Sequence, residues 1–200
     1  MDERGREVLF KVNRQSDNAT EVIASHLLVD ELGQLGAIAD EAIHTENGEQ
    51  GVCTDLLPNH RKLKDAGLEA VSNPDQLVGQ VIARDFLGDW DAHSGNYLVG
   101  PDGVTRSIDL GKAGNKGIVG SPTSTRARIL KQLGTHENVQ TYYQRYRELS
   151  DEQIQQMVER AGSHLEQPAP QVEARFIEAM IYQRDNFRKY EIYKDELSRD

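Results

Sequence analysis

One short stretch of the chain, Asp91-Ala-His-Ser-Gly-Asn96, carries most of its polar chemistry. It follows a segment with the apolar spacing of a buried helix, and Asp109 lies thirteen residues beyond Asn96. Residues 97–108 have the pattern of two short strands joined by an Asp102-Gly103 turn, which would return Asp109 to the side of Asn96. Carboxylate and carboxamide oxygens are the ligands that Mg²⁺ prefers. The spacing therefore predicts a magnesium site.

A lysine near the start of the chain could act on the same ligand. Lys11 lies in a short apolar run, residues 7–13, that predicts a β-strand. Its positive charge would steady the phosphates of a nucleotide bound with the magnesium. A lysine on an edge strand is commonly a solvated surface residue, so the functional interpretation of Lys11 depends on the downstream motif.

The order of these residues resembles a known family. Asp91-x-His93-x-x-Asn96 followed by Ile108-Asp109-x-Gly resembles the catalytic and metal-binding loops of the protein-kinase-like superfamily. It is most similar to the branch of phosphoinositide 3/4-kinases, actin-fragmin kinase and HipA-type bacterial kinases. The resemblance covers about residues 7–118. It implies an α+β, two-lobed kinase-like fold, with a reduced N-terminal lobe over residues 1–57 and a mostly helical C-terminal lobe over residues 58–200.

The resemblance also implies roles for the residues of the motif. Asp91 would orient or deprotonate the acceptor hydroxyl, and His93 would lie close to the transferred phosphate. Asn96 and Asp109 would hold Mg²⁺ on the phosphates of ATP. Catalysis would then rest on positioning and charge neutralisation rather than on a covalent intermediate.

Upstream residues match the same pattern in order. Lys11 would contact the phosphates, and Glu21 on the following helix would position Lys11. Residues 51–57 would form the hinge strand that contacts adenine, with Thr54, Asp55 and Leu56 as the residues of the contact. One departure is that ten residues precede Lys11, with Gly5 as their sole glycine, whereas these kinases carry a phosphate-covering loop there.

The expected function is ATP- and Mg²⁺-dependent transfer of the γ-phosphate to a hydroxyl. A protein Ser/Thr is favoured over a lipid as acceptor because a chain of net charge −10 suits an anionic bilayer poorly. The resemblance to bacterial kinases suggests a toxin or effector domain. Three alternatives stay open: a nucleotide-binding pseudokinase or interaction module, a phosphoinositide kinase, and a kinase-like enzyme that transfers AMP or glutamate.

Capping signals predict where the helices begin. Asn18-Ala-Thr-Glu21 has the form of a capping box, which offers Glu21 a structural role in place of the pairing with Lys11. The first helix would end at Gly33. Further helix starts are predicted at Asn73-Pro74, Thr135 and Asp151, and a last helix over about 171–197.

Composition excludes several classes of protein. The chain has 200 residues, of which 28% are charged and 37% hydrophobic, and Cys53 is its single cysteine, so no intrachain disulfide can form. The negative charge argues against nucleic acid as a partner. No apolar run is long enough to insert stably in a membrane, and no signal peptide is apparent. We expect a cytoplasmic protein, or one secreted or delivered into the cytoplasm of a target cell.

The remaining histidines, Asp89 and Trp90 do not point to a further functional site. The six histidines are scattered and form no His-Glu-x-x-His motif, so the sequence does not predict a zinc site. Asp89 is expected at a turn or helix end, with a supporting role beside the loop left open. Trp90 is expected to pack.

Overall fold

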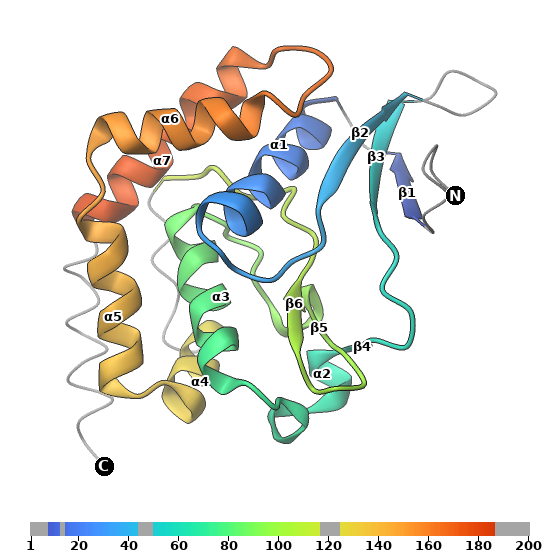
Figure 1. The fold of residues 1–200 in the computed structure, drawn as a ribbon, viewed down its shortest axis with the longest axis vertical. Helices are drawn as coiled ribbons and strands as arrows, with labels where there is room; N and C mark the ends of the chain where they lie inside the picture. The colour runs from blue at the N-terminus through green and yellow to red at the C-terminus, as the bar shows by residue number, and fades with distance from the viewer. Residues whose placement is uncertain (1–7, 13–14, 44–49, 117–124, 187–200) are drawn as a thin grey trace.

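The structure is a computed structural model that describes residues 8–12, 15–43, 50–116 and 125–186 (Figure 1). The fold is α+β, with two small antiparallel sheets and a larger helical part. The strands are β1 (Val8–Val12), β2 (Ala39–Ile43), β3 (Gln50–Asp55), β4 (Arg61–Lys62), β5 (Tyr97–Val99) and β6 (Thr105–Ser107). The α-helices are α1 (Gln15–His26), α2 (Leu63–Ala66), α3 (Pro74–Phe86), α4 (Thr125–Leu133), α5 (His136–Arg147), α6 (Asp151–Gly162) and α7 (Pro170–Asn186).

The first sheet places the lysine strand beside the predicted hinge strand. Its order is β1-β3-β2, with Lys11 opposite Val52 and Leu9 opposite Thr54. Helix α1 packs against this sheet, and Val22 of α1 meets Ala39 and Val52 in a small buried cluster. The side chain of Lys11 is thereby held close to α1.

The second sheet lies between the two polar loops, because β5 follows the loop with Asp91 and Asn96, and β6 precedes the loop with Asp109. It has the order β4-β5-β6, and β5 pairs with β6 as the hairpin predicted around Asp102-Gly103. The chain that follows α1 runs alongside this sheet, because the Ala37 N–H donates to the Ser107 carbonyl and the Ser107 N–H to the Leu35 carbonyl. The two sheets are therefore tied together on one side of α3.

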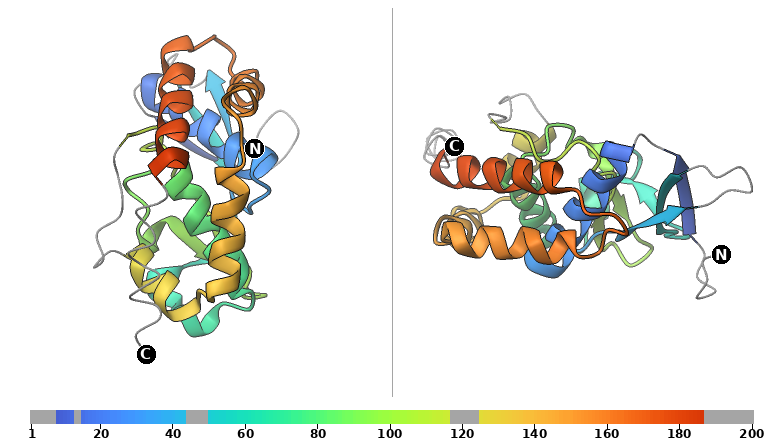
Figure 2. Two further views of the ribbon diagram at one scale, coloured as in Figure 1. Left: turned by 90° about the vertical axis from the view of Figure 1, so that its left-hand side faces the viewer. Right: turned by 90° about the horizontal axis from the view of Figure 1, so that it is seen from above.

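Helix α1 shares the main hydrophobic core with the helical part of the chain. Ile23 of α1, and Leu27 and Leu28 directly after it, are fully buried in the same cluster as Leu77 of α3 and Phe176 of α7. In the right-hand view of Figure 2, α6 and α7 run side by side, and α1 contacts both of these helices as well as β2 and β3 of the first sheet. The boundary expected at residues 57/58 stays a prediction, and the core of α1 extends across it.

Local capping explains three of the helix starts. The Asn73 side chain accepts from the Gln76 N–H, with Pro74 at the first helical position. Thr135 and Ser150 each complete a capping box. These three starts and the hairpin confirm what short-range chemistry predicted.

The predicted start of the first helix was wrong. Helix α1 begins at Gln15, so Asn18 is an interior, buried residue rather than the cap, and Glu21 contacts Lys11 instead of closing a capping box. The predicted stop is confirmed, since the helix passes through a π-helical turn (Leu27–Glu31) to Gly33 at φ +67°. The turn expected at Asn47-Gly48 and the end of the last helix lie outside the described residues.

Within the described ranges, we find no helix that is both long and apolar enough to cross a membrane.

Candidate functional site

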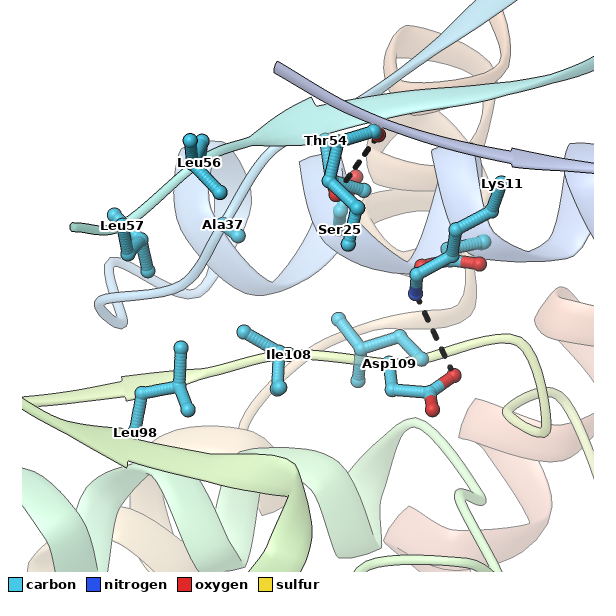
Figure 3. A pocket seen from close by; sticks show the side chains of 12 residues that line it. Lys11, Ser25, Ala37, Thr54, Leu56, Leu57, Leu98, Ile108 and Asp109 are labelled. Carbon is cyan, nitrogen blue, oxygen red and sulfur yellow. Dashed lines mark hydrogen bonds and ion pairs between the residues drawn. The ribbon is translucent and has the colours of Figure 1, made fainter. Parts of the chain in front are cut away.

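A cavity of about 130 Å³ lies between the first sheet and the chain that leaves β6 (Figure 3). Its walls are mostly aliphatic, and its polar residues gather toward one end, where Lys11 and Asp109 point toward each other. It is lined by Leu9, Lys11, Glu21, Ser25, Ala37, Thr54, Leu56, Leu57, Leu98, Ile108, Asp109 and Leu110. An engineered apolar cavity of about 150 Å³ binds benzene, so a cavity of this volume can hold a single flat ring.

Three charged residues from three different elements of the chain meet at the polar end. The Lys11 Nζ donates to Glu21 Oε1 at 2.7 Å and lies 3.8 Å from Asp109 Oδ1. Glu21 is buried, whereas Lys11 is partly exposed and Asp109 is 55% exposed. The lysine is therefore held from behind by a buried carboxylate and faces a second carboxylate at the opening.

The burial of Glu21 governs its electrostatics. Desolvation raises the pKa of Glu21 above its ordinary value, and the Asp109 charge acts in the same direction, while the Lys11 ammonium opposes both. A carboxylate that is costly to bury is stabilised by a close, hydrogen-bonded cation. The pair thus fixes the position of the Lys11 ammonium rather than adding much net stability.

The loop after α3 brings Asp91, His93 and Asn96 together. The Asn96 side-chain amide donates to the Asp91 carbonyl at 2.9 Å, and the Asn96 N–H donates to the His93 carbonyl at 2.9 Å. The His93 Nε2 lies 3.9 Å from Asp91 Oδ1, and the two side chains are 56% and 38% exposed. A carboxylate and an imidazole are therefore presented to solvent by a loop whose backbone is tied by hydrogen bonds.

Arg84 joins this loop to the one that carries Asp109, and it was missed at the level of sequence. Its guanidinium is fully buried and donates to Asp89 Oδ2 at 2.7 Å. It also donates to the carbonyls of Asn96 at 3.1 Å, Ile108 at 2.8 Å and Asp109 at 3.1 Å. One planar group thus fixes the backbone next to both predicted metal ligands. An arginine inside an amphipathic helix gives no sequence signal for this role, because its acceptors lie up to 25 residues away.

Two residues beside the loop differ from expectation or refine it. Asp89 is fully buried and accepts both from Arg84 and from the Asp91 N–H, so it supports the loop from within. Trp90 does not pack as predicted, since it is 52% exposed. The loop turns outward between two residues that point inward, Asp89 and the buried Ala92. Asp109 has a positive φ of 58°, a conformation that aspartate tolerates better than most residues.

The predicted hinge residues are placed unequally. Thr54 lines the cavity, but it is paired within the sheet on both sides, with Leu9 and with Ala39. Asp55 ends β3 opposite Val8. Leu56 follows the strand, lines the cavity and is 45% exposed. Leu56 is thus the residue of the three that combines a place in the cavity with a backbone beyond the ladder.

The fold brings the predicted site residues together in two groups. One group, at the cavity, is Lys11, Glu21 and Asp109, and the other, on the neighbouring loop, is Asp91, His93 and Asn96. The two groups are linked through Arg84 and through the Ile108 N–H, which donates to the Asn96 carbonyl at 2.9 Å.

Comparison with known proteins shows a shared fold. No family model and no curated protein matches the sequence. Among solved structures, the chain is similar to the N-terminal 618-residue fragment of LepB from Legionella pneumophila, with a TM-score of 0.62 and 14% identity. The match covers 90% of this chain and 39% of that one. At this identity the two proteins share a fold, and the chain spans about two fifths of the length of its structural neighbour.

Proposed function

We propose that this chain is a kinase-like phosphotransferase that binds Mg-ATP in the cavity and transfers the γ-phosphate to a hydroxyl. The observation that carries the proposal is the meeting of Lys11, Glu21 and Asp109 at the polar end of an otherwise aliphatic cavity. Strand β1 and helix α1, which are neighbours in sequence, supply a cation and its buried partner, and the distant chain after β6 supplies an exposed carboxylate. The two-lobed kinase-like arrangement, with β1–β3 and α1 as the smaller lobe, belongs to the same proposal.

The residues present fit a magnesium nucleotide. The aliphatic walls suit the adenine base, with Leu56 at the hinge, and the ammonium of Lys11 suits the phosphates. Asn96 and Asp109 offer the oxygen ligands that Mg²⁺ prefers, on two loops held together by one guanidinium. When bound, the ion would neutralise phosphate charge.

The chain itself then supplies positioning and a base. The Asp91 carboxylate, 38% exposed, would accept the proton of the acceptor hydroxyl as its oxygen bonds to the γ-phosphorus and the bond to the β-phosphate oxygen breaks, releasing ADP. His93 lies beside Asp91 and would contact the transferred group. The acceptor we favour is a protein Ser/Thr, on the ground of the negative charge.

Calorimetric titration with ATP tests the binding half of the proposal. We expect binding that requires Mg²⁺ and that falls at least tenfold in Lys11→Met and in Asp109→Asn. Lys116→Met is the matched control, because Lys116 also lies 2.7 Å from a glutamate, Glu178, but outside the cavity. ATP binding that is unaffected by Lys11→Met and Asp109→Asn would exclude this cavity as the nucleotide site.

Mass spectrometry of candidate substrates tests the transfer half. We expect Asp91→Asn to retain ATP binding and to lose transfer by at least a hundredfold, as removal of a positioned base commonly does. Equal modification by the wild type and Asp91→Asn would refute the role of Asp91, and ATP binding without any transfer would favour the pseudokinase alternative. The added mass separates a phosphate from AMP or glutamate.

A further inference from the structure

A pair of histidines that the sequence leaves far apart meets where the end of α1 lies against the turn after α6. His26 ends α1, and His164 lies in the turn after α6. Their rings stack, with centroids 3.6 Å apart and an angle of 7° between the planes. One nitrogen of each histidine and one oxygen of Asp30 lie within 4.8 Å of one another. Two imidazoles and a carboxylate are thus gathered from two elements.

The hydrogen bonds of His26 leave one of its nitrogens available. The Nδ1 lies 2.6 Å from Asp30 Oδ2, so in the neutral ring that donates from Nδ1 to this carboxylate the Nε2 carries the lone pair. His26 is 5% exposed, and its Nε2 has no hydrogen-bond partner among the described residues. A buried nitrogen without a partner needs an explanation, and a bound ion or an ordered water would supply one.

A second carboxylate faces that nitrogen at a distance too long for a hydrogen bond. The Asp40 Oδ1 lies 3.8 Å from His26 Nε2. Ligand atoms around tetrahedral zinc, with bonds of about 2.0–2.2 Å, lie about 3.4 Å apart. The gap between His26 and Asp40 therefore approaches the separation of two ligands of one ion. Metal-bound histidines also commonly donate their other N–H to a carboxylate, which is the position of Asp30.

We propose that His26 Nε2, His164 and Asp40 bind one divalent transition-metal ion such as Zn²⁺, with Asp30 as the residue that orients His26. Imidazole nitrogens select zinc, nickel or copper rather than Mg²⁺. The site would join α1 to the α6–α7 turn. It lies apart from the predicted magnesium ligands and does not depend on the proposed kinase function.

Binding requires one movement. A ring nitrogen donates its lone pair in the plane of the ring, so two stacked imidazoles cannot both point at one ion. His164 is exposed and lies in a turn, so its ring can rotate out of the stack while the buried His26 stays in place. Zinc is therefore expected to break the ring stack.

Titration of the chelator-treated 200-residue chain with Zn²⁺ tests the site, followed by Co²⁺ absorption for its geometry. We expect one ion per chain, bound at micromolar concentration or below and not displaced by millimolar Mg²⁺. His164→Ala and Asp40→Asn each change an exposed or half-exposed side chain and should weaken binding at least tenfold. His60→Ala is the control for a histidine elsewhere, and Asp109→Asn controls for zinc at the predicted magnesium site; neither should alter the affinity.

Two results would overturn the proposal: no zinc bound at about 100 μM, or affinity unchanged by His164→Ala or Asp40→Asn. Proton NMR gives an independent readout, since loss of the stack should move the ring signals of His26 and His164 and leave those of His60 in place. Because Asp109→Asn removes a predicted magnesium ligand and leaves the histidine pair intact, failure of nucleotide binding and failure of zinc binding are separable.

Discussion

Arg84→Met is the substitution that most directly tests how the two polar loops are held. Methionine has a similar length and suits the apolar surroundings, but it has no donor for Asp89 or for the carbonyls of Asn96, Ile108 and Asp109. Asp89 would remain fully buried without its cation. The main loss is therefore electrostatic rather than a loss of volume.

The size of the effect follows from that buried charge. Removing one partner of a buried ion pair costs about 3–5 kcal/mol. Each carbonyl that loses its donor adds up to about 1–3 kcal/mol, although Asn96 keeps a donor in the Ile108 N–H. Against a typical stability of about 5–15 kcal/mol, we expect Arg84→Met to fold marginally. Arg84→Lys keeps the charge without the planar fork and should be intermediate.

Urea denaturation followed by tryptophan fluorescence measures the loss at the relevant place, because Trp90, the single tryptophan, adjoins Asp89. The double variant Arg84→Met/Asp89→Asn should recover part of the stability, since it removes the unpaired charge and keeps an oxygen for the Asp91 N–H. Arg184→Met is the control: Arg184 also pairs with carboxylates, Asp151 and Asp185, and donates to the Leu149 carbonyl, but both carboxylates are more than half exposed, so the substitution should cost about 1 kcal/mol or less.

Two outcomes would refute the reasoning. One is a cost for Arg84→Met no larger than that for Arg184→Met. The other is a double variant less stable than Arg84→Met, which would mean that the unpaired Asp89 charge is not the main penalty.

Two further predictions concern the same region. Tyr97 is fully buried, its hydroxyl has no partner in the described part of the chain, and burial raises its pKa to about 12. Above pH 10 the unfolded chain loses the Tyr97 proton before the folded chain does, so the free energy of unfolding falls by up to about 3 kcal/mol between pH 10 and pH 12. Tyr97→Phe should remove that loss and should be neutral or stabilising at pH 7. Denaturation at several pH values measures both effects. Gly88 and Gly33 have φ of +66° and +67°. A Cβ added at Gly88 would overlap the Asn115 carbonyl, whereas a Cβ added at Gly33 would meet no atom within 4 Å. Gly33→Ala should therefore cost about 1–2 kcal/mol of unfolding free energy and Gly88→Ala roughly 2–5 kcal/mol; equal costs would contradict the predicted overlap.

Short-range chemistry made much of the local structure predictable. Asn73 with Pro74, Thr135, and the Asp102-Gly103 turn each act on backbone groups within a few residues, so their effects are visible in the sequence. The proximity of the Asn96 and Asp109 loops across that hairpin was likewise predictable, because a tight turn returns the chain to its starting point.

What depends on distant contacts was decided by the tertiary structure. Asn18 had the form of a helix cap, but the helix that carries it starts earlier and buries it. Glu21 of the same motif instead accepts a hydrogen bond from Lys11 on strand β1. Local patterns describe what a residue can do, and the long-range packing of α1 selects among those options.

The same limit applies to the residues that no pattern marked. Arg84 gathers acceptors from two loops, and His26 meets His164 across 138 positions of the chain. Hydrogen bonding and stacking act over a few ångströms, and no sequence period encodes which distant segments reach that distance. The sequence therefore indicated the kinds of chemistry available to this protein, and the fold decided which side chains could act together.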